Sequence, residues 1–510
     1  MERIVILDFG SQYTHLIARR IREMNVLTEI HPPNITALPS GTKGLILSGG
    51  PSSVHENTFG FSSDLLDPTL PILGICFGMQ LMNVIHHGKV ESLGKGEYGK
   101  QKLFPSLTSP LFKGLENEEV VWMSHQDSIK ELAACYQPIA QSESGLLAAF
   151  QHKEHPHFAV QFHPEVTHTL KGDQILKNFI TLCACKGEWT LEHHLSTMKE
   201  EIREKVQQGK VISLVSGGVD STAATLLCTQ ALSPSQVYPL HVDTGLMREN
   251  ESQSVKDLLN IENLTLVDAS HEFLTALKGV TDAEKKRHII GDLFIHILNR
   301  EIEKLNLDED KTFICQGTLY TDLIESGRGC GNNAAVIKSH HNVNAPIVEK
   351  KRREGLIVEP NRLLFKDEVR QLCKVLGLPK KLVWRHPFPG PGLAIRILGE
   401  VTSDRVKTLQ QADQIYLEEI EKHGLYDHIW QAFALFLPIT TVGVMGDQRR
   451  TGNVIALRAV TSSDGMTADF YSFSPEFLSR VSTRIINEVP TIARVVYDIT
   501  SKPPGTIEWE

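Results

Sequence analysis

Short apolar runs, each ending at a glycine or a proline, recur along the first third of the chain. Uninterrupted apolar runs of this length are typical of strands buried on both faces of a parallel sheet, and the stretches between them suit crossover helices. The pattern predicts a doubly wound α/β domain over residues 1–188. The runs are IVILDFG (4–10), GLILSGG (44–50), ILGICFG (72–78) and FAVQFHP (158–164).

The same pattern starts again after an amphipathic stretch that suits a connecting helix. Its apolar positions recur every three or four residues, at Leu191, Leu195, Met198, Ile202 and Val206. New apolar runs then follow at residues 211–218, 236–245, 263–270 and 312–318. We therefore expect a second doubly wound α/β domain over residues 189–386.

The last part of the chain has a different pattern. The segment HPFPGPGLAIR (386–396) carries three prolines and two glycines, which indicates a linker or a rigid loop. A helix is expected around 402–423, and β-rich runs follow at 441–446, 453–460 and 493–500. These elements predict a small α+β domain over residues 387–510.

Composition supports three domains and excludes some classes of protein. The chain has 510 residues, 41% of them hydrophobic, and 52 Lys and Arg against 61 Asp and Glu, a net charge of −9. A net acidic chain is a poor candidate for a nucleic-acid coat. The first residues lack a signal-peptide pattern, the longest apolar stretch falls short of the ~20 residues of a membrane span, and the eight cysteines form no CxxC pair. We expect a cytoplasmic protein with reduced thiols that binds neither nucleic acid nor membrane.

Cys76 lies in a pattern that hydrolases use to expose a nucleophile. A strand ends, Gly74 and Gly78 stand two residues to either side of Cys76, and a helix begins. At the start of a helix the dipole and the free N–H groups favour the thiolate. A cysteine that only packs in a strand–helix turn remains an equal alternative on this pattern alone.

A histidine and a carboxylate further along the chain favour the catalytic interpretation. His163 and Glu165 end a predicted strand, where residues two apart face the same side, so Glu165 is expected to orient the His163 imidazole. The glycine-rich turn at 48–51 ends another predicted strand and is a candidate oxyanion hole.

These residues resemble the class I glutamine amidotransferase domain, through DFGSQY, LSGGP, GICFGMQ and HPE. The resemblance implies hydrolysis of glutamine to glutamate and ammonia. Cys76 would attack the side-chain amide, His163 would transfer the proton to the departing ammonia, and Glu165 would orient His163. The oxyanion N–H groups and the glutamine pocket would come from Gly50, Phe77 and Gln80.

A second glycine-rich turn, SGGVDS (216–221), lies between a predicted strand and a predicted helix. Backbone N–H groups in such a turn bind phosphate, although a generic turn is the alternative. No lysine follows the glycines, so it is not the loop of kinase-type nucleotide-binding proteins. It resembles the loop of the ATP pyrophosphatases, which cleave ATP between the α and β phosphates. By that resemblance ATP would contact Ser216, Gly217, Gly218, Val219, Asp220, Ser221 and Val242.

Two further carboxylates are candidate magnesium ligands. Asp322 and Glu325 stand three residues apart and share one face of a helix. A solvated acidic face is the alternative. Together with Asp220 they form the predicted Mg²⁺ site for ATP.

Over essentially its whole length the chain resembles the glutamine-hydrolysing GMP synthetases. The further signatures are IIGDLF, KSHHN, KDEVR, HPFPGPGLAIR, VGVMGD and KPPGTIEWE. The resemblance implies a ligase that adenylates xanthosine monophosphate (XMP) with ATP and then aminates it to GMP, with AMP, pyrophosphate and glutamate as the other products. It also implies a homodimer formed through the C-terminal domain. The XMP contacts would be Arg287, Gln431, Lys502 and Glu508.

Two other functions remain open at this point. One is an amidotransferase-linked ligase with another acceptor, such as an NAD-synthetase-like protein, and the other is a nucleotide-sensing protein that has lost its chemistry. The chain also departs from the usual family pattern at Thr321 and in the segments 327–331, 344–353 and 448–450. These departures affect the lid loop and leave the catalytic patterns intact.

Overall fold

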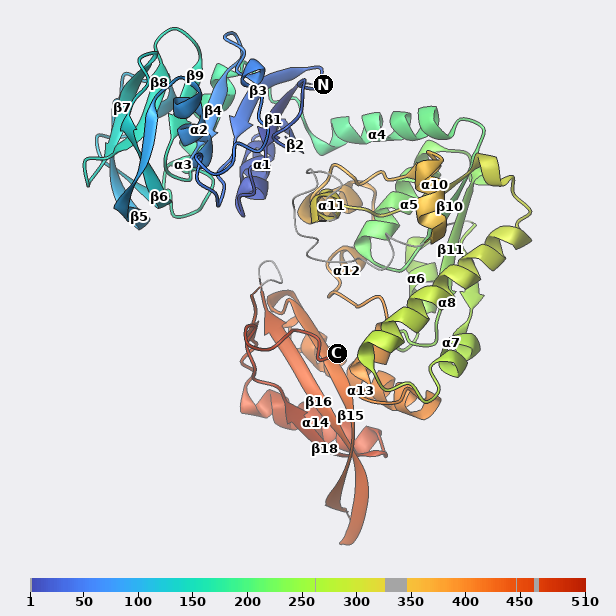
Figure 1. Cartoon of the computed structure of the whole chain (residues 1–510). Helices are drawn as coiled ribbons and strands as arrows, with labels where there is room; N and C mark the ends of the chain where they lie inside the picture. The colour runs from blue at the N-terminus through green and yellow to red at the C-terminus, as the bar shows by residue number, and fades with distance from the viewer. Residues whose placement is uncertain (1, 262, 326–345, 446, 463–466) are drawn as a thin grey trace. The chain divides into compact units, whose positions relative to one another are not determined.

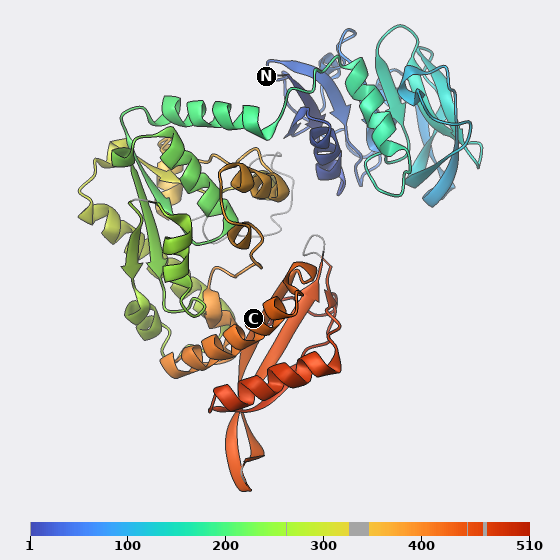
Figure 2. The same ribbon diagram turned by 180° about the vertical axis from the view of Figure 1, so that it is seen from behind.

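The computed structural model describes residues 2–510 apart from 262, 326–345, 446 and 463–466. These residues form two compact units (Figures 1 and 2). One unit consists of the residues up to His194 together with the described residues 321–325, and the other contains Leu195–Tyr320 and the C-terminal part of the chain. No helix of the described residues is both long and apolar enough to cross a membrane.

The first unit is built on a nine-stranded sheet, all of it within the described residues 2–194. Its parallel half confirms the sequence prediction, because the four apolar runs form adjacent parallel strands together with one more. In sheet order these strands are β2 (Leu27–His31), β1 (Arg3–Leu7), β3 (Thr42–Leu47), β4 (Ile72–Ile75) and β9 (His157–Val160).

The other half of this sheet is antiparallel and was not predicted. It continues from β9 through β8 (Leu147–His152), β7 (Tyr136–Ser142), β5 (Lys89–Pro105) and β6 (Glu119–Glu131). Residues along β6 alternate between buried and partly exposed positions, as in a strand with one covered face.

Helices α1, α2 and α3 accompany the parallel half of the sheet (Figure 1). Helix α2 packs through Phe77 and Leu81 on the face that carries Val5, Leu7 and Leu45. The helices are α1 (Thr14–Glu23), α2 (Phe77–Ile85) and α3 (Gly172–Leu182). Helix α4 (Leu191–Val206) is the predicted connecting helix.

The second unit contains a five-stranded parallel sheet in its described part. Its order is β12 (Thr265–Asp268), β11 (Val237–Asp243), β10 (Lys210–Leu214), β13 (Thr312–Cys315) and β14 (Ile357–Val358). Both faces are covered, because Ile212 of β10 packs with Leu298 of α8, whereas its neighbour Ser213 hydrogen-bonds Thr225 of α5. This is the predicted doubly wound arrangement.

Eight helices lie between β10 and residue 383 of the chain, among the described residues. They are α5 (Val219–Ala231), α6 (Glu251–Leu259), α7 (Ser270–Ala276), α8 (Ala283–Lys304), α9 (Tyr320–Glu325), α10 (Pro346–Arg353), α11 (Lys366–Val375) and α12 (Lys380–Val383).

A third, smaller sheet lies at the C-terminal end of the same unit, as the sequence predicts. It contains β15 (Gln431–Met445), β16 (Gln448–Thr461), β17 (Asp469–Phe470) and β18 (Ile492–Tyr497). Helices α13 (Ser403–Lys422) and α14 (Pro475–Glu488) cover one face of it, and Figure 2 shows them on the same side. The other face packs against Ile507 of the C-terminal tail.

The segment interpreted as a linker or a rigid loop is a buried rigid element. Leu393, Ala394 and Arg396 have no exposed surface and lie in a short 3₁₀ helix, Gly392–Arg396. The surrounding hydrophobic core also holds Leu246 after β11 and Leu409 of α13. The second parallel sheet and the C-terminal sheet therefore share one hydrophobic core.

Candidate active sites

Cys76 forms the sharp strand-to-helix turn that the sequence predicts. β4 ends at Ile75, α2 begins at Phe77, and Cys76 between them has φ 52° and ψ −106°. A positive φ is uncommon for a residue with a side chain and often marks a functional site. A Cβ at Gly74 would lie 2.8 Å from the backbone of Gly78, and a Cβ at Gly78 would lie 2.4 Å from the Leu47 carbonyl oxygen. Both flanking positions therefore need glycine.

His163 and Glu165 meet as predicted, although not for the predicted reason. The His163 Nδ1 and Glu165 Oε1 atoms are 2.7 Å apart, and both side chains are buried. β9 ends at Val160, so the contact forms in the turn after the strand and not by alternation along it. Burial alone lowers the pKa of His163, but the Glu165 carboxylate and the hydrogen bond with Cys76 outweigh burial and raise that pKa to about 10. The imidazole therefore carries a proton at neutral pH.

A cavity of about 810 Å³ opens beside Cys76. Gly50, Phe77, Gln80 and His163 line it as predicted. Gly50 has no room for a side chain, because a Cβ there would lie 2.8 Å from the Phe9 carbonyl oxygen.

The opposite wall of the cavity comes from β6, which the sequence reasoning did not include. Ser124, His125 and Asp127 line this wall. The Gln80 side chain donates to the Asp127 carbonyl at 2.9 Å, and Gln161 Nε2 lies 3.6 Å from Cys76 Sγ. The polar run at 124–127, which interrupts an alternating strand, was the signal that could have indicated this wall.

The SGGVDS turn has the compact form of a phosphate-binding loop. β10 ends at Leu214 and α5 begins at Val219. The Ser216 and Ser221 hydroxyl oxygens are 2.9 Å apart, and the Gly218 N–H donates to Ser216 Oγ. Gly217 has φ +78°, which only glycine adopts at low cost.

The charged groups beside this loop include Asp220, in the first turn of α5, together with Lys366 and Arg385. The Lys366 ammonium lies 3.3 Å from Asp220 Oδ2, and Asn361 donates to the Asp220 carbonyl. Lys366 was part of the KDEVR signature, but no role was predicted for it. Val242, the predicted adenine contact, is buried on β11.

The predicted carboxylate pair, Asp322 and Glu325, is only partly described. Asp322 lies on α9, whereas the side chain of Glu325 and the segments 327–331 and 344–345 lie outside the described residues. Among the residues that the structure does describe, no group of three or more His, Cys, Asp or Glu side chains is arranged to hold a metal ion.

Two of the four predicted XMP contacts come together. Gln431 Nε2 donates to Glu508 Oε1 at 2.7 Å. Arg287 pairs with Glu284 on α8, and Lys502 pairs through its backbone with Ala468.

Two buried cations at this site were not predicted. Arg396 holds both carboxylate oxygens of Glu508, at 2.7 and 3.1 Å, and has no exposed surface. The Lys286 ammonium is equally buried and pairs with Glu510 at 2.6 Å. Their partners are more than 100 positions away in the sequence, so no local spacing indicates them.

Comparison with known proteins relates these parts to three family models. Residues 5–183 match the model of class I glutamine amidotransferases, 190–288 match that of NAD synthase, and 418–509 match that of the GMP synthase C-terminal domain. A Thermoplasma acidophilum protein of known structure is 37% identical, covers 36% of this chain and 94% of its own, and has a TM-score of 0.34.

Full-length relatives give the identification. A GMP synthase (glutamine-hydrolysing) from Saccharomyces cerevisiae is 49% identical over 100% of this chain and 98% of its own length. One from Francisella tularensis is 47% identical over 100% of this chain and 99% of its own length. The chain belongs to the family of glutamine-hydrolysing GMP synthases.

Proposed function

We propose that the protein converts XMP to GMP, using ATP to activate XMP and glutamine as the nitrogen source. The observation that carries this proposal is that one chain holds both a cysteine elbow with a buried His–Glu pair and a phosphate-type loop. The first arrangement suits amide hydrolysis and the second suits the release of pyrophosphate.

In the glutaminase step, the Cys76 thiolate attacks the side-chain amide carbon of glutamine. The N–H groups of Gly50 and Phe77 stabilise the oxyanion, and Gln80 helps to shape the pocket. The protonated His163 gives its proton to the leaving ammonia, and Glu165 holds the imidazole in place through their 2.7 Å contact. Water then attacks the thioester, with His163 as the general base, and glutamate leaves.

In the synthetase step, an oxygen of XMP attacks the α-phosphorus of ATP and pyrophosphate leaves. Ser216, Gly217, Gly218, Val219 and Ser221 would hold the pyrophosphate, and Val242 would contact adenine. Ammonia then displaces AMP to give GMP. The XMP contacts are Gln431 and Glu508, with Arg396 fixing Glu508, together with Arg287 and Lys502.

A magnesium ion fits the chemistry of this site. Mg²⁺ prefers carboxylate oxygens beside substrate phosphates, and the Asp220 carboxylate lies in the first turn of the helix that follows the loop. Asp220, Asp322 and Glu325 would hold the ion, which would neutralise phosphate charge. Lys366 would add a second positive charge next to Asp220.

We further propose three domains with the predicted bounds, 1–188, 189–386 and 387–510, and a cytoplasmic homodimer. The β15 strand leaves Ile439, Val442 and Val444 exposed, which suits a surface that pairs with a second copy. The described cysteines are free thiols, a state that a reducing compartment maintains.

The test uses Cys76→Ala with XMP, ATP and MgCl₂, and either glutamine or ammonium chloride. We expect GMP formation from glutamine to vanish while GMP formation from ammonium continues, because the variant removes the nucleophile of only one step. Loss of both activities in a folded variant would refute the two-site scheme. An unchanged glutamine-dependent rate would refute the role of Cys76.

A further inference from the structure

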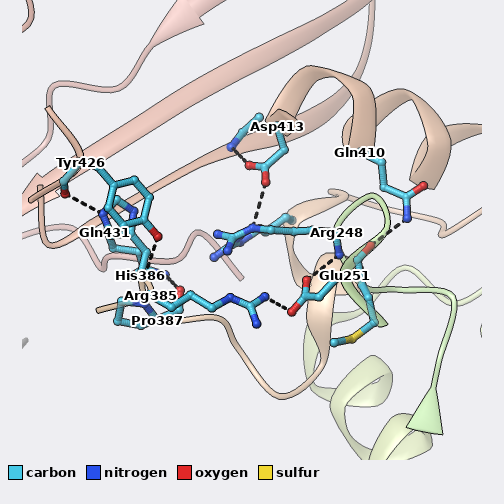
Figure 3. Close-up of polar contacts among 12 residues, drawn as sticks. Arg248, Glu251, Arg385, His386, Pro387, Gln410, Asp413, Tyr426 and Gln431 are labelled. Carbon is cyan, nitrogen blue, oxygen red and sulfur yellow. Dashed lines mark hydrogen bonds and ion pairs between the residues drawn. The ribbon is translucent and has the colours of Figure 1, made fainter. Parts of the chain in front are cut away.

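A chain of largely buried polar contacts runs from the phosphate-type loop toward the XMP residues, and Figure 3 shows its part from Arg385 to Gln431. At the loop end, Arg385 Nη1 donates to the Gly217 carbonyl at 3.3 Å, and the same guanidinium pairs with Glu251. The Glu251 side chain is 4% exposed. Arg385 therefore links the backbone of the loop to the first turn of α6.

The next contacts cross from α6 to α13. Glu251 accepts a hydrogen bond from the Arg248 backbone N–H at 2.9 Å. The Arg248 side chain reaches Asp413 of α13, with Nε 3.1 Å from Oδ2. One turn earlier on α13, Gln410 donates to the Met247 carbonyl at 2.7 Å. Figure 3 shows both α13 side chains directed toward the segment before α6.

The last contacts reach the strand that carries a predicted XMP residue. Asp413 Oδ1 accepts from the Ala434 N–H of β15 at 2.8 Å. Gln431, three residues earlier on the chain, donates to Glu508 at 2.7 Å and to the Pro387 carbonyl at 3.2 Å. The Arg248 guanidinium also lies over the ring of Phe388, 4.9 Å from its centre, so it contacts the residue after Pro387 as well.

Stability alone does not account for the Arg248–Asp413 pair. The two side chains are 12% and 2% exposed, and desolvation offsets much of the attraction in a buried ion pair. The shared hydrophobic core, which includes Leu246 and Leu409, already holds the two sheets together. What an ion pair adds to an apolar contact is direction and a fixed distance.

We infer that Arg248 and Asp413 are positioning residues for the adenylation step. Their pair holds the loop proposed to bind pyrophosphate at a fixed distance from Gln431, the β15 residue proposed to bind XMP. The α-phosphorus of ATP and the attacking XMP oxygen then meet in a reactive geometry. This inference rests on the proposed function, and it assigns neither residue a direct contact with substrate.

The test compares three variants of the full chain by ammonium-dependent pyrophosphate release. Asp413→Asn removes the charge but keeps an oxygen for the Ala434 N–H. The double variant Arg248→Met with Asp413→Leu replaces the ion pair by an apolar contact and guards against a folding defect. Glu419→Gln is the matched control, because Glu419 is also on α13, is also 2% exposed and also pairs with an arginine, Arg484, but that arginine belongs to α14.

We expect kcat to fall about tenfold or more in the first two variants, as misplacement of reactants by a fraction of an ångström does. The dissociation constants of XMP and of α,β-methylene-ATP should each stay within about threefold of the original, because no proposed contact is removed. Glu419→Gln should keep the original kcat.

Three outcomes would overturn the inference: an unchanged kcat in both pair variants, an equal fall in the control, or a loss confined to XMP binding. If the unmodified protein forms no GMP from ammonium, the proposed function fails instead, so the two failures are distinguishable.

Discussion

Replacing Glu165 by glutamine tests the electrostatics of the proposed glutaminase site. The structure raises the pKa of His163 from 6.5 to about 10, although burial acts in the opposite direction. A shift of this size corresponds to about 5 kcal/mol in favour of the protonated imidazole. Without the carboxylate only Cys76 opposes the effect of burial, and we expect the pKa of His163 to fall toward 6.5. The proton needed by the leaving ammonia is then absent at neutral pH.

The assay is glutamate release from glutamine between pH 5.5 and 10. We expect kcat to fall about 10³- to 10⁴-fold near pH 8, as loss of the orienting carboxylate does in comparable triads. The alkaline limb of kcat/KM should move from about pH 10 toward pH 6.5. GMP formation from ammonium chloride should be unchanged, because Glu165 belongs only to the glutaminase site.

A second buried His–Glu pair in the same unit supplies the control. His125 Nε2 lies 3.2 Å from Glu97 Oε2, and both side chains are buried. Glu97→Gln removes a similar carboxylate without changing the contact between His163 and Glu165. The alkaline limb of the kcat/KM profile of this variant should therefore stay near pH 10. If the limb of Glu165→Gln stays in place too, Glu165 does not set the protonation of His163 and the reasoning is wrong.

The same pKa predicts a dependence of stability on pH. A histidine whose pKa is raised on folding contributes stability that is complete below its unfolded pKa of about 6.5 and is lost as the pH rises through about 10. Urea unfolding at pH 6 and pH 10 should show this loss for the unmodified protein and much less of it for Glu165→Gln.

Three further predictions concern other parts of the chain. Gly50→Ala should abolish glutaminase activity and spare ammonium-dependent synthesis, because the new Cβ would lie 2.8 Å from the Phe9 carbonyl oxygen. A glutaminase rate equal to that of the unmodified protein would contradict the tight fit at this position. Arg396→Met should cost about 3–5 kcal/mol of stability and raise KM for XMP, since it leaves Glu508 without its buried partner. An unchanged thermal midpoint together with an unchanged KM would contradict this role of Arg396. Burial lowers the pKa of His157 to about 4, so its contribution to stability is present above pH 6.5 and falls by at most about 3 kcal/mol as the pH drops toward 4. Denaturant titrations at pH 7 and 4.5 should show a smaller fall for His157→Gln, and identical falls would exclude the effect.

The sequence indicated the parallel strands because burial on both faces leaves an uninterrupted apolar run. It did not indicate β5 to β8, since strands with one exposed face mix polar and apolar residues and their partners are set by hairpins. The proline-rich segment before Arg396 suggested a loop. Arg396 is buried in an ion pair with Glu508, 112 positions later, which no local pattern reveals.

The difference between local and long-range signals also explains which parts of the candidate sites could be predicted. Cys76 and the SGGVDS loop could be found because their chemistry depends on neighbours a few residues away. The β6 wall of the cavity and the Arg248–Asp413 pair join residues that only the folded chain brings together. The polar run at 124–127 was a local signal for the wall, whereas no local pattern indicates the Arg248–Asp413 pair.

The two halves of the nine-stranded sheet supply different parts of the proposed glutamine site. The reacting groups follow β4 and β9 of the parallel half, whereas the facing wall comes from β6 at the far antiparallel edge. Side-chain changes in β6 can therefore alter which amide fits, whereas its backbone must stay in place, because the Ser124 carbonyl lies 3.8 Å from Cys76 Sγ and the Trp122 carbonyl accepts a hydrogen bond from the His163 N–H. An enzyme with another amide donor could be obtained from this scaffold by redesigning a single edge strand.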